Sequence, residues 1–80
     1  SLQEECEAIN WYQQRISIEP DEAAKAIMRD AQKEEFKHFG MDLEFLLRKT
    51  PTWQTIIKEI LFKEGDIVKL GKAGEDAAGG

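Results

Sequence analysis

Apolar side chains recur in the first half of the chain at alternating spacings of three and four residues, which is typical of amphipathic helices. The first set of positions, which we call the first stripe, comprises Leu2, Glu5, Ile9, Tyr12 and Ile16. The second stripe comprises Ala24, Met28, Ala31, Glu35, His38, Asp42 and Phe45. Each stripe predicts a helix that buries one face, and each contains polar residues where the pattern favours apolar ones.

Turn and capping signals set the expected limits of these two helices. The first helix is expected to run from the start of the chain to about Ser17. Pro20 suits the first position of the second helix, because proline lacks the amide hydrogen that goes unused there. The second helix is expected to continue to about Lys49, with Gly40 as an interruption that costs about 1 kcal/mol relative to alanine.

The remainder of the chain predicts a short third helix and a tail. Thr50 is expected to cap a helix over about residues 51–63. Residues 65–80 are rich in glycine and predict a flexible tail, which leaves residues 1–64 as the helical domain. The expected fold is therefore all-α: an antiparallel two-helix hairpin plus a short third helix. A hairpin cannot cover its own apolar face, so we expect it to dimerise into a four-helix arrangement.

Composition narrows the classes of function. A net charge of −5 disfavours binding to nucleic acid or to an anionic membrane, and mildly favours cations. No apolar run approaches the roughly 20 residues needed to span a bilayer, and no secretory signal is visible. Cys6 is the only cysteine, which rules out an internal disulfide and favours a cytoplasmic location. Cys6 has acidic neighbours and no basic residue close to it in the sequence, so nucleophilic catalysis by Cys6 is not expected.

Polar residues on the two stripes predict a metal site. A buried carboxylate without a partner is costly, so Glu5 must find a cation, a donor or a proton. Glu35 and His38 are three residues apart and project from one side of the helix. Ferritin-like di-iron sites combine two such Glu-x-x-His pairs with two further glutamates. This chain offers one pair and one glutamate, and a two-fold dimer would supply the rest.

Other interpretations of these residues remain open. The acidic segment around Glu35 and His38 can be an ordinary solvated helix face. The chain can also be a non-catalytic helical oligomerisation module with a structural divalent metal, or a partner-binding hairpin without metal. Tyr12 can donate a hydrogen bond to the site, take part in electron transfer, or be an amphipathic core aromatic. Three further aromatic residues are expected to serve packing: Phe36, Phe39 and Trp53.

Three motifs together resemble the encapsulated ferritin family, the ferritin-like ferroxidases carried as cargo in bacterial encapsulin shells. The likeness covers roughly residues 4–65. The motifs are Glu4-Glu5-x-Glu7-Ala8 before Trp11-Tyr12, Arg29-Asp30 before Glu34-Glu35-x-x-His38, and Leu61-Phe62-x-Glu64-Gly65. In combination they are far more specific than Glu-x-x-His alone.

This resemblance implies roles for individual residues. The metal ligands of the family fall on Glu5, Glu35 and His38. Its tyrosine beside the metal centre falls on Tyr12, and the neighbouring tryptophan falls on Trp11. Family glutamates that hold metal on its way in fall on two residues of the first helix, Glu4 and Glu7. Glu4 and Glu7 can alternatively be ordinary surface acids. The resemblance assigns four residues to catalysis: Glu5, Glu35, His38 and Tyr12.

The resemblance also implies an assembly and a location. The expected chain is half a ferritin, with two iron ions at each dimer interface, in an annular decamer. Other divalent metals such as calcium or zinc can substitute for iron. The expected activity is oxidation of Fe(II) to Fe(III), for iron storage or detoxification inside an encapsulin nanocompartment in the cytoplasm. Residues 65–80 show no clear match to the short docking peptide that such cargo usually carries, so shell loading rests on the resemblance alone.

Overall fold

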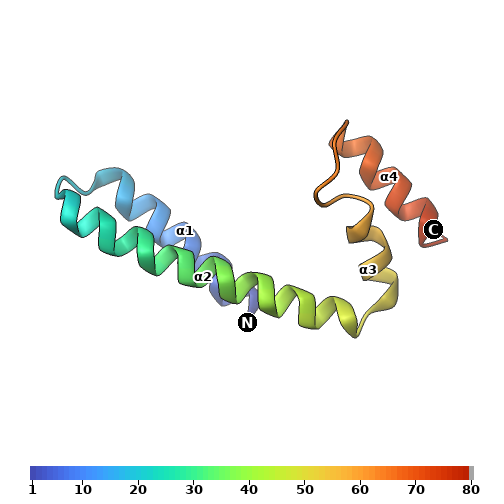
Figure 1. Cartoon of the computed structure of the whole chain (residues 1–80), viewed down its shortest axis with the longest axis horizontal. Helices are drawn as coiled ribbons and strands as arrows, with labels where there is room; N and C mark the ends of the chain where they lie inside the picture. Colours follow the sequence, from blue (N-terminus) through green and yellow to red (C-terminus); the bar gives the residue numbers. More distant parts are fainter. Residues whose placement is uncertain (80) are drawn as a thin grey trace. The chain divides into compact units, whose positions relative to one another are not determined.

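The computed structural model describes residues 1–79, and every regular element in this part of the chain is a helix (Figure 1). It has four helices, which are α1 (Leu2–Ile18), α2 (Glu22–Arg48), α3 (Pro51–Lys58) and α4 (Ile67–Ala77). The helices belong to two compact units, one formed by Ser1–Glu44 and one that begins at Phe45. Within the described residues, no helix is long and apolar enough to cross a membrane.

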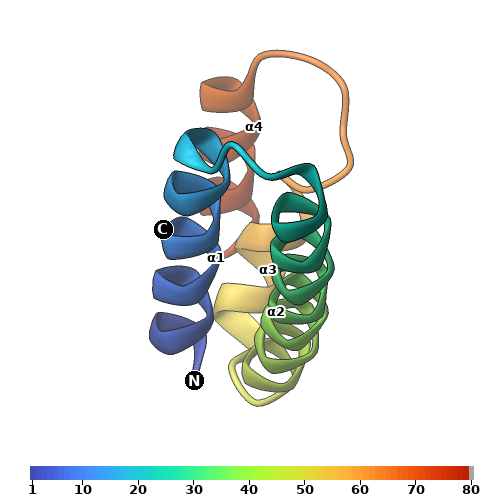
Figure 2. The same cartoon turned by 90° about the vertical axis from the view of Figure 1, so that its left-hand side faces the viewer.

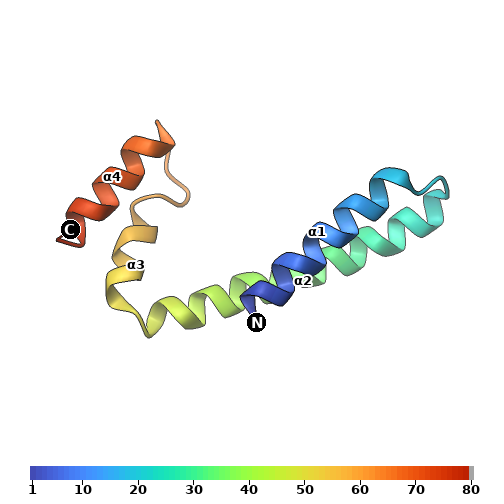
Figure 3. The same ribbon diagram turned by 180° about the vertical axis from the view of Figure 1, so that it is seen from behind.

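The first unit is an antiparallel hairpin in which α1 and the first part of α2 lie side by side, as Figures 1, 2 and 3 all show. Asp21 caps the start of α2, because its carboxylate accepts hydrogen bonds from the backbone amides of Ala23 and Ala24 at 2.8 and 3.1 Å. The expectation that Pro20 is the first helical residue is therefore wrong. The carboxylate of Asp21 satisfies amides that a helix start leaves unbonded, so Pro20 precedes the cap.

The predicted lengths of the first two helices are correct to within a residue at their C-terminal ends. Helix α1 ends at Ile18 and α2 ends at Arg48. Gly40 does not interrupt α2, which continues through it. A methyl group built at Gly40 would have nothing within 4 Å, so its cost is one of backbone entropy alone.

The second unit starts with a tight connection from α2 into α3. Thr50 is at the N-cap position of α3, but its hydroxyl donates a hydrogen bond backward to the carbonyl of Leu46 at 2.8 Å. Helix α3 ends at Lys58 rather than near residue 63, which corrects the predicted limit. A hydrogen-bonded turn follows, in which Phe62 has a φ of 59° and Gly65 a φ of 118°. These left-handed conformations cannot continue a right-handed helix.

Helix α4 occupies most of the segment for which a flexible, irregular tail was predicted, and that prediction is wrong for residues 67–77. The carboxylate of Asp66 accepts a hydrogen bond from the backbone amide of Lys69 at 3.0 Å and so caps the helix. Gly74 is buried against α3, where a methyl group would lie 2.7 Å from the carbonyl oxygen of Ile56. The glycine thus permits close packing of α4 on α3. The predicted domain boundary after residue 64 falls between these two packed helices.

Candidate metal centre

The first stripe and most of the second stripe lie on the inner faces of the hairpin, whereas Phe45 belongs to the second unit and is 62% exposed. All five residues of the first stripe are at least partly buried, and Glu5 and Ile16 are buried. On α2, Glu35 and Asp42 are half-buried, whereas His38 is exposed in the single chain. Because consecutive helical residues are rotated by about 100°, His38 lies at the edge of the second stripe. A buried carboxylate on α1 therefore faces a stripe that also contains carboxylates.

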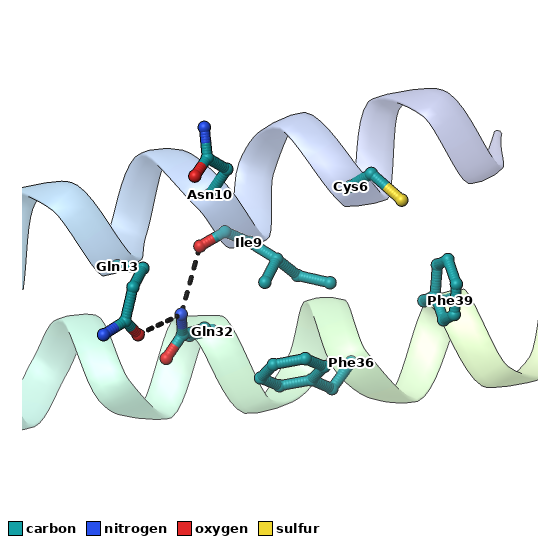
Figure 4. Close-up of a pocket in the computed structure, with 7 residues that line it drawn as sticks. All are labelled: Cys6, Ile9, Asn10, Gln13, Gln32, Phe36 and Phe39. Atoms are coloured by element: carbon teal, nitrogen blue, oxygen red, sulfur yellow. Dashed lines mark hydrogen bonds between the residues drawn. The ribbon is translucent and has the colours of Figure 1, made fainter. Parts of the chain in front are cut away.

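Gln32 fixes the register between the two helices (Figure 4). Its side-chain amide donates hydrogen bonds to the carbonyl oxygen of Ile9 at 3.0 Å and to Oε1 of Gln13 at 3.1 Å. In an antiparallel pair, each step back along α1 corresponds to a step forward along α2. Glu5 is therefore level with about residues 36–40 of α2. This register places Glu5 within about one helical turn of Glu35, His38 and Asp42.

Glu5 is the buried acid of the hairpin, with only 6% of its surface exposed. Its Oε2 atom is shielded from solvent and makes no hydrogen bond. The amino group of Ser1 lies 3.1 Å from that oxygen as an ion pair, without hydrogen-bond geometry. A carboxylate that is removed from water in this way favours a cation beside it.

Asp42 is the partner of Glu5 across the hairpin. The two carboxyl groups lie within hydrogen-bonding reach of each other. The hydrogen bond that Asp42 donates, together with burial and the negative charge of Glu5, raises the pKa of Asp42 above its ordinary value. The same hydrogen bond, followed by the ion pair with the amino group of Ser1, lowers the pKa of Glu5. The two shifts are therefore opposite in direction, as is typical of two neighbouring carboxyl groups that interact with each other.

The predicted ligands do not form a complete site in one chain. In the part of the chain that the structure describes, no group of three or more His, Cys, Asp or Glu side chains is placed to hold a metal ion. Glu5 is inside the hairpin, Glu35 is half-buried beside it, and His38 points to solvent. The assignment of these three residues as metal ligands stays a prediction that requires donors from two chains.

The aromatic pair of α1, Trp11 and Tyr12, follows Glu5 along the same helix. Tyr12 is half-buried on the same stripe as Glu5, two helical turns further along α1. Trp11 is 58% exposed, and its ring meets that of Tyr12 edge to face, with 5.1 Å between the ring centroids. Tyr12 therefore lies at the level of the hairpin interior, and Trp11 projects outward from it.

Glu4 and Glu7 lie outside this interior. Both side chains are exposed. Glu4 accepts a hydrogen bond from the hydroxyl of Ser1 at 2.9 Å, which is the main reason that its pKa is lowered. Glu7 accepts a hydrogen bond from the side-chain amide of Gln3 at 3.3 Å. Their position on the surface agrees equally with metal uptake and with ordinary surface acids.

Asp42 belongs to the second stripe, but the sequence pattern assigned it no role. The signal that could have identified it is its spacing of four residues from His38, because residues four apart project from one side of a helix. What the sequence lacked was the register that brings Asp42 to Glu5.

A groove of about 450 Å³ lies between α1 and α2 (Figure 4). Phe36 and Phe39, which were predicted to serve packing, line it together with Cys6. Phe36 remains 54% exposed within the single chain. The groove is lined mainly by apolar atoms and holds no carboxylate among its lining residues, so the acidic cluster and the groove are separate features.

Comparison with known proteins identifies relatives along the whole chain. Residues 1–64 match the model of the EncFtn-like family. The chain is 36% identical over 80 residues to a ferritin-like protein of Thermotoga maritima, a match that covers 100% of this chain and 68% of that protein. It is 38% identical over 79 residues to an encapsulated ferritin-like protein of Rhodospirillum rubrum, covering 99% of this chain and 55% of that protein. The chain thus spans little more than half of the second relative. No solved structure matches it significantly.

Proposed function

Because this chain belongs to the EncFtn-like family of encapsulated ferritin-like proteins, we propose that it is a ferroxidase that oxidises Fe(II) to Fe(III) with dioxygen. The site forms between two copies of the chain, with two iron ions per dimer interface. The resemblance of the sequence motifs to this family is confirmed by the family match, and the proposal extends that match to an activity.

The observation that carries the proposal is the state of Glu5. Glu5 is 6% exposed, and its Oε2 atom has no hydrogen bond and only the amino group of Ser1 beside it at 3.1 Å, so a bound cation would stabilise this carboxylate. The register brings Glu5 level with the Glu-x-x-His segment formed by Glu35 and His38. Carboxylate oxygens with one imidazole suit Fe(II), and carboxylates stabilise Fe(III) further. These donors therefore fit iron as a substrate.

Each residue then has a defined task. Glu5 and Glu35 bind the iron ions through their carboxylates, and His38 binds through an imidazole nitrogen. Tyr12, on the same stripe two helical turns from Glu5, donates a hydrogen bond toward the site from the partner chain or through water. Glu4 and Glu7 hold metal at the surface before it enters. Calcium or zinc can occupy the same oxygen-rich site without being oxidised.

Self-association completes the site and covers apolar surface. Within residues 1–79, Ile16 is the only buried apolar side chain. Several large apolar residues of the hairpin are more than half exposed, including Trp11, Ile27 and Met41. A two-fold dimer would bury part of this surface and double the donor set. We propose that such dimers assemble further into an annular decamer. We also propose that this decamer is held inside an encapsulin shell, since the Rhodospirillum rubrum relative is named as an encapsulated protein.

The experiment that tests this function is aerobic addition of Fe(II), followed by absorbance in the near ultraviolet. Glu35→Ala and His38→Ala are each expected to reduce the oxidation rate by at least tenfold, because each removes a metal ligand. Asp30→Asn is the matched control, since this exposed acid lies on another face of α2 and should leave the rate unchanged. Unchanged rates in both site variants would refute the assignment.

A structural metal site is the rival function, and oxygen consumption separates the two. A structural site binds a divalent ion at the same residues but consumes no dioxygen when Fe(II) is added. A ferroxidase consumes dioxygen in proportion to the iron added. Metal-free protein that assembles identically would count against the purely structural role.

A further inference from the structure

We propose that Gln32 is a positioning residue for the metal site, which holds Glu5 at the level of the Glu-x-x-His segment of α2. This inference rests on the proposed function, because the residues that it aligns are the proposed ligands. Neither the sequence motifs nor the predicted ligands include Gln32. In this role Gln32 binds no metal itself and acts only through the alignment of α1 with α2.

The link between Gln32 and α1 is directional and reaches the backbone. The Nε2 atom of Gln32 donates one hydrogen bond to the carbonyl oxygen of Ile9 at 3.0 Å and another to Oε1 of Gln13 at 3.1 Å (Figure 4). Both hydrogens of the side-chain amide are thus used across the hairpin. A side-chain acceptor can change its rotamer, whereas a backbone carbonyl moves only with its helix. The bond to Ile9 therefore fixes the position of α1 along α2.

The apolar contacts around this link do not fix the alignment by themselves. The groove that Gln32 lines is otherwise mainly apolar, with Ile9, Phe36 and Phe39 among its lining residues. Apolar attraction is non-directional and roughly proportional to the area removed from water. Gln32 is half-buried, and an amide that is shielded from water and loses its partners is costly. Sliding of α1 along α2 would leave this amide unpaired, so the observed alignment is favoured.

The spacing of residues on each side of the link determines what it aligns. Glu5 precedes Ile9 by four residues, which is a rise of about 6 Å along α1. On the antiparallel α2, Glu35 and His38 follow Gln32 by three and six residues, or by about 4.5 and 9 Å. Glu5 is therefore level with the segment between Glu35 and His38. A slip of one helical turn, about 5.4 Å, would move Glu5 out of this interval in either direction.

Metal coordination makes the alignment matter. Distances from ligands to a metal are held to within about 0.2 Å, so a slip of a helical turn cannot be absorbed by the site. In a two-fold dimer each copy contributes the same hairpin, and one alignment then sets the spacing of all the donors.

The test compares metal binding with stability. Gln32→Met keeps the length of the side chain but removes both donors. We expect it to weaken Mn(II) binding, measured by calorimetry on the assembled protein, by at least tenfold, as is typical when a group that orients ligands is lost. The visible absorption of bound Co(II) should also change, because its donors are rearranged.

Ile16→Val is the matched control. Ile16 is a buried residue of the first stripe, so losing one carbon there destabilises the hairpin but leaves both hydrogen bonds of Gln32 intact. This variant should bind Mn(II) as tightly as the unaltered protein, with the same Co(II) spectrum. Circular dichroism confirms that each variant keeps its helix content. If Gln32→Met does not fold, Gln13→Ala removes only the weaker of the two links and gives the same comparison.

The outcomes separate this inference from the proposed function. If Gln32→Met and Ile16→Val bind Mn(II) equally well, or lose binding equally, Gln32 acts only through stability and the inference is overturned. The ferroxidase proposal then still stands if Glu35→Ala loses binding. If only the variant at Gln32 loses binding and changes the Co(II) spectrum, Gln32 positions the site. If the unaltered protein binds neither Mn(II) nor Co(II), both proposals fail together.

Discussion

Gly74 allows a sharp test of how α4 packs on α3. A methyl group at this position would lie 2.7 Å from the carbonyl oxygen of Ile56, 3.2 Å from its Cα and 3.3 Å from its carbonyl carbon. All three atoms belong to the backbone, so the contact cannot be relieved by rotating a side chain. In Gly74→Ala the two helices must therefore move apart.

Two opposing contributions set the size of the effect. Replacing a glycine inside a helix by alanine stabilises it by about 1 kcal/mol. Forcing an extra methyl group into a close-packed contact typically costs about 1–3 kcal/mol. Gly71 is the matched control because it lies in the same helix, and a methyl group there has nothing within 4 Å. Gly71→Ala should show only the gain, so Gly74→Ala should be less stable than Gly71→Ala by about 1–3 kcal/mol.

Thermal unfolding followed by circular dichroism measures this difference. For a domain of this size, 1 kcal/mol corresponds to a change in Tm of about 4–8 °C. Hydrogen exchange gives a local readout, because the amides of α4 should lose protection in Gly74→Ala before those of the hairpin. Equal or greater stability of Gly74→Ala relative to Gly71→Ala would refute the close packing of α4 on α3.

Three further predictions concern the hairpin, the α4 cap and the acid pair. Gln32→Ala removes both hydrogen bonds to α1 and should lower the free energy of unfolding by about 1 kcal/mol in urea titrations; no change would mean that these bonds do not set the register. Asp66→Ala removes the α4 cap and should cost about 1 kcal/mol, seen as faster exchange of α4 amides; unaltered exchange would argue against the cap. Because the pKa of Asp42 is raised, its contribution to the stability of the metal-free protein is lost as the pH rises above about 3.8. Because the pKa of Glu5 is lowered, its contribution is lost as the pH falls below about 4.5. Asp42→Asn should therefore gain stability relative to the unaltered protein as the pH rises above about 3.8, and a pH-independent difference would contradict the pairing.

The periodic pattern of the sequence predicted the hairpin well, because burial of one helix face is a local property. The spacing of Leu2, Ile9 and Ile16 is a repeat of seven residues, and the helix that it predicts is the one observed. The position of Glu5 on that stripe likewise predicted a buried carboxylate, and Glu5 is buried. The positions of the stripes require only the rotation of about 100° per residue.

The second unit was harder to predict, because glycine has two opposite uses. The sequence treats Gly71 and Gly74 as signs of flexibility, since glycine costs a helix backbone entropy. The structure shows that Gly74 instead lets two helices approach closely, and that Asp66 starts α4 with a cap. Composition cannot distinguish a glycine that loosens a chain from one that a neighbouring backbone requires.

The sequence by itself determined which residues share a helix face, and with them the candidate ligands Glu5, Glu35 and His38. It did not determine which residues of α1 lie opposite which residues of α2. That register depends on contacts across the hairpin, such as those of Gln32, and a change of one helical turn would move Glu5 by about 5.4 Å. Carboxyl groups interact strongly only over a few ångströms, and a sequence pattern does not give distances of that size. The pairing of Asp42 with Glu5 was therefore visible only in the tertiary structure.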